Sequence, residues 1–305
     1  MGCQQEQQDP NAASVSSQFY GGDQGLVISF VPGAPPDEVV DKGQPFGASV
    51  LIENKGDDDV AAGEYRVTLT GIDPALFSTT AAAMTQKPSE ELRAAQVDAS
   101  GTRIEGAKVT VDFPQGGSFE HSREISGAVT YNLKADLCYQ YSSKANANLC
   151  VLEDILGTQG RADKLCEISE SKDVDASGAP VKVVNFVESA ASSDKISFVF
   201  TIRHVGSGSV HALGSDCSDE FSKRNKVKVT IDTGISGTLS CSGISDGSAS
   251  GSTYTGTVQL LNGEREIRCT QTVNNPSDFE SLAEITIDYD YRTSVSKQLR
   301  VKHIG

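Results

Sequence analysis

Seven cysteines are the side chains of this sequence with the clearest capacity for chemistry. They are Cys3, Cys138, Cys150, Cys166, Cys217, Cys241 and Cys269. No two of them have the C-x-x-C spacing that zinc ribbons and redox motifs use. Without Cys3 the set is even and spread through β-rich sequence, which is typical of three disulfides formed in an oxidising compartment. Buried unpaired thiols are the alternative interpretation.

Cys138 and Cys150 flank a segment that we interpret as a hairpin with its turn near Lys144. In that register both cysteines lie on the solvent face, opposite the inward Tyr139, and a bond between neighbouring strands is geometrically feasible. The sequence therefore predicts a disulfide between Cys138 and Cys150.

The other four cysteines are assigned by strand face and by elimination. Cys241 and Cys269 each share a strand face with an apolar neighbour, so both are expected to point inward and to pair. That leaves Cys166 to pair with Cys217, a bond that would tie the linker to the second domain. Six cysteines allow fifteen connectivities, so other pairings stay open.

Metal and catalytic centres have little support in the sequence. The acidic turn Asp57-Asp58-Asp59 is the one candidate cation site, because Ca²⁺ prefers several oxygen ligands around one point. It lacks the spaced ligands of an EF-hand, and a solvated charged turn is the alternative. The four histidines have no H-E-x-x-H or H-x-H spacing, and no serine lies in a G-x-S-x-G elbow. We therefore expect no enzyme activity and no cofactor other than this Ca²⁺.

Charge and length limit the class of partner and the number of domains. The 305 residues carry a formal net charge of -15, which repels phosphate backbones and anionic lipid headgroups. Nucleic acid is therefore not expected as a partner. The length is enough for two domains of ordinary size.

The first residues, MGCQQEQQDP, are similar to the cleavage point of a lipoprotein signal peptide, with Cys3 as the lipid-carrying residue. The apolar region that precedes such a cysteine is not in the sequence, so we expect the chain to begin at a processed end. A free Cys3 is the alternative. Residues 1–24 are polar and are interpreted as a flexible tether, with the first domain starting at Leu26.

An internal repeat with an offset of 150 residues organises the rest of the chain. The alternating segment around Ile52 followed by Gly56 recurs around Ile202 and Gly206. The pair Tyr139-x-Tyr141 recurs as Tyr289-x-Tyr291 at the same offset, and we expect these tyrosines to pack inward. The two halves are therefore predicted to share one fold.

Each half has about seven short alternating segments separated by turn residues, the pattern of an immunoglobulin-like β-sandwich. The predicted fold class is all-β, with one sandwich over residues 25–158 and a second over residues 159–305. A β-barrel is the alternative. Residues 72–104 form an insertion in the first domain, where Ser89 could cap one or two helical turns.

The segments Asn54-Lys55-Gly56, Cys138-Tyr139-x-Tyr141 and Gly178-Ala179-Pro180-Val181 carry a resemblance to known proteins. They resemble the tandem immunoglobulin-like, cell-adhesion-related (CARDB-like) domains of uncharacterised secreted archaeal surface proteins. The resemblance covers both halves and implies an extracellular sandwich fold without a defined activity.

These features together predict a non-catalytic binding or adhesion protein attached to the outer cell surface, with a protein or glycan as its partner. A structural subunit of a surface filament, appendage or layer is the alternative, in which residues 12–30 add a strand to a neighbouring sheet. A non-catalytic module of a secreted glycan-processing system is the third hypothesis. Contact with a membrane is expected only through a lipid on Cys3.

Overall fold

The computed structural model describes residues 19–98, 100, 102–160 and 163–304. It is all-β, with antiparallel pairing in every sheet and one parallel pair, β2 with β20. The strands of the first half are β1 (Leu26–Phe30), β2 (Glu38–Val40), β3 (Ala48–Asn54), β4 (Tyr65–Thr70), β5 (Thr85–Gln86), β6 (Gln96–Val97), β7 (Arg103–Ile104), β8 (Lys108–Phe113) and β9 (Ala128–Val151).

The strands of the second half are β10 (Ser171–Lys172), β11 (Asp175–Ala176), β12 (Val181–Ser192), β13 (Lys195–His204), β14 (Ser209–His211), β15 (Lys226–Asp232), β16 (Leu239–Ser242), β17 (Ser245–Ser250), β18 (Thr253–Gln259), β19 (Glu264–Thr272) and β20 (Phe279–Lys302). Two single-turn 3-10 helices, η1 (Ala82–Met84) and η2 (Phe221–Lys223), complete the secondary structure of the described residues. None of the helices in the described part of the chain is long and apolar enough to cross a membrane.

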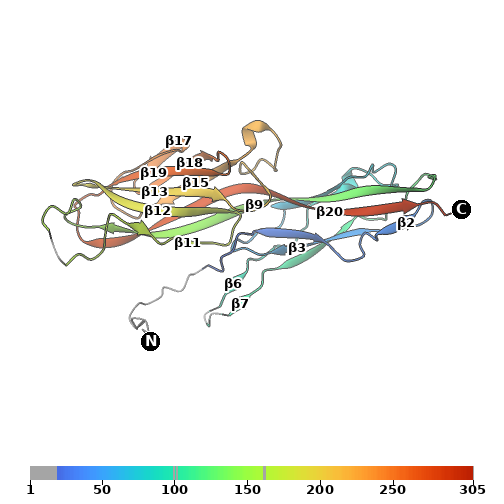
Figure 1. Cartoon of the computed structure of the whole chain (residues 1–305), viewed down its shortest axis with the longest axis horizontal. Coiled ribbons are helices and arrows are strands. Elements are labelled where there is room, and N and C mark those ends of the chain that lie inside the picture. Colours follow the sequence, from blue (N-terminus) through green and yellow to red (C-terminus); the bar gives the residue numbers. More distant parts are fainter. Residues whose placement is uncertain (1–18, 99, 101, 161–162, 305) are drawn as a thin grey trace, which may run out of the picture.

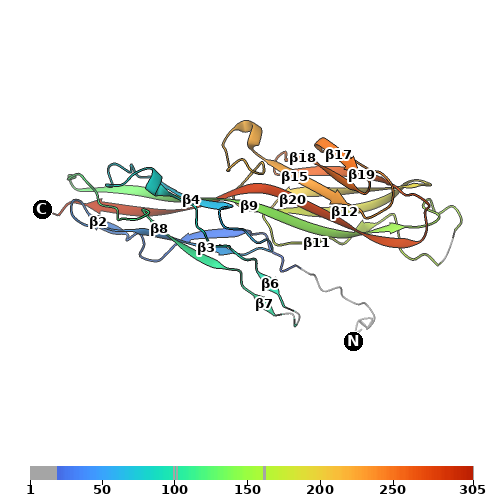
Figure 2. The same ribbon diagram turned by 180° about the vertical axis from the view of Figure 1, so that it is seen from behind.

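Two strands of 24 residues each, β9 and β20, run through the whole molecule. They pair antiparallel over their full length, from Phe279 opposite Val151 to Lys302 opposite Ala128. Figures 1 and 2 show the resulting elongated shape, with two lobes joined by this green and red pair. Both lobes are therefore built on this pair of strands.

Each lobe adds its own smaller sheet to the long pair. In the first lobe the three-stranded sheet β1-β3-β8 lies beside β2, β4, β5 and one end of β9 and β20. In the second lobe the five-stranded sheet β10-β12-β13-β19-β16 lies beside β15, β17, β18 and the other end of the pair. Because β9 and β20 both run through the two lobes, each lobe contains residues from both sides of the predicted division near residue 158.

One face of β9 is buried along both lobes. Its odd-numbered side chains from Leu133 to Val151 are all buried, whereas most even-numbered ones are partly or fully exposed. Alternation with a period of two is what a strand with one covered face produces. Both smaller sheets therefore pack on the same side of the long pair.

The predicted hairpin near Lys144 is wrong, because residues 128–151 form one uninterrupted strand. The predicted helical turns after Ser89 are wrong as well. Between residues 72 and 104 the structure has η1, the short strand β5 and the β6–β7 ribbon, and residues 88–92 are not helical. The pattern of Pro88 followed by acidic residues fits a helix start, but Leu92 instead pairs with Val60 in an isolated bridge.

The start of the first lobe bears on the prediction that residues 12–30 add a strand to a neighbouring sheet. β1 begins at Leu26, the residue at which the sequence analysis starts the first domain, and residues 26–30 already pair with β3 of the same chain. These residues already form an edge strand of their own sheet, and strand donation by residues 12–30 stays a prediction. Cys3 and residues 12–18 lie outside the described residues.

The 150-residue offset recurs in the contacts. Ile52 lies in β3, the central strand between β1 and β8, and Ile202 lies in β13, between β12 and β19. Gln140 pairs with Asp290, and these two residues are themselves 150 positions apart. The two long strands are therefore related by a local two-fold axis between Gln140 and Asp290, a position here called the crossing.

Candidate functional site

Four tyrosines surround the crossing of the two long strands. Tyr139 and Tyr291 face each other with ring centroids 5.7 Å apart, and Tyr141 and Tyr289 are 6.3 Å apart. All four are buried, as predicted from their inward register. They join the two lobes into one packed core, and no exposed aromatic surface for a glycan is formed by them.

The tyrosine hydroxyls make matching hydrogen bonds in the two halves. The Asp58 N–H donates to the Tyr141 hydroxyl over 3.3 Å, and the Gly208 N–H donates to the Tyr291 hydroxyl over 2.7 Å. A Cβ at Gly56 would lie 2.0 Å from the Tyr141 hydroxyl oxygen, closer than any side chain tolerates. The glycine turn of the repeat therefore makes room for the tyrosine.

The three carboxylates of the acidic turn point to different partners. Asp57 accepts hydrogen bonds from the backbone N–H groups of Tyr20, Gly21 and Gly178. Asp58 accepts from the Ser142 N–H at 2.8 Å, and Asp59 accepts from the Ala94 N–H at 2.6 Å. The turn thus fastens the chain near residue 20 and the segment before β12 to the crossing, and the three groups do not converge on one point. Ca²⁺ binding at this turn stays a prediction.

The described residues form three disulfides, and only one of the expected pairings is found. The bonds are Cys138–Cys217, Cys150–Cys166 and Cys241–Cys269. The expected Cys138–Cys150 bond is wrong because both residues lie on one continuous strand, and Cys166–Cys217 falls with it. Three disulfides are typical of a protein that folds in an oxidising environment.

Cys138 and Cys150 do lie on the outer face of β9, as the register predicts, yet both are buried. Cys138 is bonded to a loop that follows β14, and Cys150 to the segment before β10. The sequence pattern indicates only the direction of the side chain, not what packs over it.

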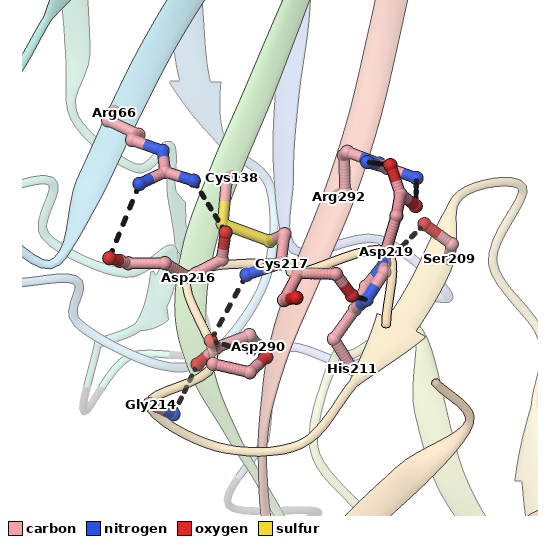
Figure 3. The surroundings of a disulfide bond; sticks show 12 residues. Arg66, Cys138, Ser209, His211, Gly214, Asp216, Cys217, Asp219, Asp290 and Arg292 are labelled. Atoms are coloured by element: carbon pink, nitrogen blue, oxygen red, sulfur yellow. Dashed lines mark hydrogen bonds and ion pairs between the residues drawn. A yellow bond between two sulfur atoms is a disulfide. The ribbon is translucent and has the colours of Figure 1, made fainter. Parts of the chain in front are cut away.

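The loop over Cys138 spans residues 211–225 and is here called the braced loop. Figure 3 shows how it is fastened to the crossing. The Asp290 carboxylate, buried at the centre of β20, accepts hydrogen bonds from the Gly214 N–H at 2.9 Å and from the Cys217 N–H. Arg292 of the same strand makes two hydrogen bonds to Asp219, at 2.8 and 3.0 Å.

Two further contacts close the base of the loop. The ring of buried His211 lies 2.9 Å from the Ser218 carbonyl oxygen through Nδ1 and 2.9 Å from the Ser209 hydroxyl through Nε2. Arg66 of β4 forms an ion pair with Asp216, which connects the loop to the first lobe. The loop is held from both lobes and has a fixed shape.

The braced loop presents one large apolar side chain to solvent. Phe221, in η2, is 92% exposed, more than any other large hydrophobic residue described. Figure 1 shows the loop in orange, projecting from the middle of the elongated molecule. Aromatic side chains, Phe included, are enriched in protein interfaces, where a few anchor residues supply most of the binding energy.

Comparison of the two halves shows that the fold does not require this loop. In the first half, the four residues 61–64 connect Val60 to β4, whereas in the second half fifteen residues, 211–225, connect Val210 to β15. β4 and β15 hold matching places beside β9 and β20. The extra residues are an addition to the second half alone.

One buried and one partly buried carboxyl group have raised pKa values. Burial raises the pKa of Glu188 on β12 to about 7, although the Cys150 N–H at 3.0 Å and Lys172 at 3.4 Å favour its charged form. Burial likewise raises the pKa of Asp58 to about 6. Perturbed carboxyls mark some active sites, but burial is the largest cause of both shifts here.

Ionisation of these two carboxyls is expected to lower the stability of the fold by about 4 kcal/mol as the pH rises from about 5 to about 8. The folded chain holds these two protons more tightly than the unfolded chain, whose carboxyls ionise near pH 4, so folding is favoured on the acid side of this window. Carboxyls such as Asp41, whose pKa is lowered by a hydrogen bond from the Ile125 N–H, act in the opposite sense in more acidic solution. Burial lowers the pKa values of His204 and His211, so these two side chains oppose the fall inside the window. Urea unfolding across the window measures the effect.

Glu188→Gln is the matched variant for this prediction, because the amide oxygen can still accept from the Cys150 N–H. It should remove about two thirds of the fall that the two carboxyls contribute. The same pH dependence of stability in Glu188→Gln and wild type would contradict the assignment.

No protein-family model matches the chain, and no curated protein matches it. Within the described residues, no group of three or more His, Cys, Asp and Glu side chains is arranged to hold a metal ion. Among solved structures, the secreted serine protease VesC from Vibrio cholerae aligns with 12% identity over 88% of this chain and 51% of the protease, with a TM-score of 0.18. The chain thus spans about half the length of VesC.

A second alignment, to a mutant of the oxalate decarboxylase OxdC from Bacillus subtilis, has 11% identity over 82% of this chain and 71% of that one, with a TM-score of 0.16. Neither likeness amounts to a shared fold. The functional argument therefore depends on the chain's own geometry.

Proposed function

We propose that the protein is an extracellular, surface-attached, non-catalytic binding or adhesion protein whose two halves are immunoglobulin-like sandwiches. The observation that carries this proposal is the braced loop, an addition to one half only that is fastened by a disulfide and by Asp290 and exposes Phe221. A stiff, elongated scaffold that holds such a loop away from its own surface is suited to contact and not to enclosing a substrate.

The alternative function is that of a structural subunit in a surface filament or layer. It is favoured by the position of Phe221 at the middle of an elongated molecule and by apolar residues exposed at one end, described below. In both cases the three disulfides support a location outside the cytoplasm.

Binding of labelled protein to intact cells tests the leading proposal. We expect saturable binding of the oxidised protein, and a loss of about 30-fold or more in affinity for Phe221→Ser. Leu261→Ser is the control, because Leu261 is also exposed but lies on the β18–β19 turn. Binding that the two variants reduce equally, or no binding to any cell surface or to a glycan array, would refute the proposal.

A further inference from the structure

A surface at the far end of the second lobe is chemically complementary to Phe221. At this end β9 stops and β20 begins. A shallow recess lies between the residues that follow β9 and those that precede β20. The recess is lined by Leu152, Asp154, Gly157, Lys164 and Asp278. Leu156 and Leu165, neighbours of two lining residues in the sequence, are 52% and 59% exposed. This surface, residues 152–157, 164, 165 and 278, is here called the end patch.

The end patch and the braced loop differ in charge. The end patch is acidic overall, because Glu153, Asp154 and Asp278 outnumber its cation Lys164, and it includes the exposed Leu156 and Leu165. Around Phe221 the cations Lys223, Arg224 and Lys226 outnumber the carboxylates of residues 219 and 220, in a chain of net charge -15. Asp219 is also engaged by Arg224 and Arg292. An aromatic ring with a basic border therefore matches a leucine surface with an acidic border.

The two surfaces cannot meet within one molecule. Figure 1 places the braced loop at the middle of the long axis and the yellow-green segment after β9 at the end opposite the C-terminus. The rigid bracing by Cys138–Cys217 and Asp290 keeps Phe221 where it is. A contact between the two surfaces therefore requires two copies of the chain.

We infer that the protein self-associates, with Phe221 of one copy packed on the end patch of the next. This inference rests on the structural-subunit alternative of the proposed function. The contact joins two different surfaces, so the receiving copy still presents its own Phe221, and further copies add in the same direction. Because a loop at the middle meets an end, successive molecules overlap in a staggered row.

Sedimentation velocity of the purified, oxidised full chain over a range of concentrations up to millimolar tests this inference. We expect an open series of oligomers that grows with concentration and is stronger at low ionic strength, since charged borders contribute. Phe221→Ser is expected to raise the concentration needed for association by about 30-fold or more. Leu261→Ser should leave association unchanged.

A mixing experiment separates this contact from any symmetric one. Gly157→Asn obstructs the end patch and is tolerated by the backbone, because Gly157 has a φ of +68° and open space at its Cβ position. Phe221→Ser and Gly157→Asn should each be monomeric alone. Their mixture should form a heterodimer and nothing larger, because it contains one intact surface of each kind.

A wild-type chain that stays monomeric, a mixture that fails to pair, or an equal effect of Leu261→Ser would each overturn the inference. Folding of the variants is checked by their unfolding transitions. This experiment contains only the purified chain. Failure to self-associate would therefore say nothing about binding to cells, which is measured separately. Cell binding without self-association supports adhesion, and self-association without cell binding supports the subunit.

Discussion

Neither half of the chain is expected to fold as a monomer when residues 19–158 and 159–305 are produced separately. In the first fragment, β9 loses β20 along its entire length, and the sheet that covers its second-lobe end is absent. Buried side chains such as Ala145 and Leu149 would face water. Circular dichroism with thermal unfolding should show no cooperative transition for either fragment and recovery of one when the fragments are mixed.

A chain cleaved between residues 158 and 163 is the control. It keeps all strands, and the bonds Cys138–Cys217 and Cys150–Cys166 still connect the pieces. This nicked protein should unfold much like the intact one. A monomeric first fragment with a native-like transition would contradict the account, whereas a dimeric fragment that pairs two copies of β9 would follow from the two-fold crossing.

Replacing Phe200 by Ala should destabilise the protein by about 3 to 5 kcal/mol. Phe200 is fully buried in β13, and its ring lies 6.0 Å from that of Phe186 at an angle of 7°. Removing it leaves a cavity that the neighbouring strands, held by their ladder, cannot fill by collapsing. Chemical denaturation compared with wild type gives the difference.

Val199→Ala is the matched control in the same strand. Val199 is only half-buried and pairs with Val187, which is 45% exposed, so its loss should cost about 1 kcal/mol or less. Equal destabilisation by the two variants would show that the strand faces are assigned wrongly.

The strand faces could be predicted from the sequence because the period of two depends only on local burial. It places Tyr139, Phe200 and Ile202 inward, and all three are buried. The hairpin at Lys144 could have been rejected on local grounds, because no Gly or Pro occurs between Tyr139 and Val151. Strands of 24 residues are far longer than usual, so a turn was the more ordinary expectation.

The disulfide partners and the braced loop depend on contacts between distant segments. Cys138 and Cys217 are 79 residues apart, and no periodicity connects them. Phe221 carries a weak signal: the repeat aligns Val210 with Val60, and the extra length that follows only Val210 contains it. Asp290 and Arg292 hold these extra residues in place, and both belong to a strand far along the chain.

Both copies of the repeat lie in one chain. The two long strands are related by a two-fold axis, but the loops of the two halves differ. A dimer of identical subunits would display every loop twice, so an aromatic anchor would occur in pairs and each particle would be bivalent for it. Here the fifteen-residue loop belongs to the second half alone, and Phe221 occurs once. The particle is monovalent for that anchor, so contacts made through it add in one direction and produce unbranched strings instead of a cross-linked network.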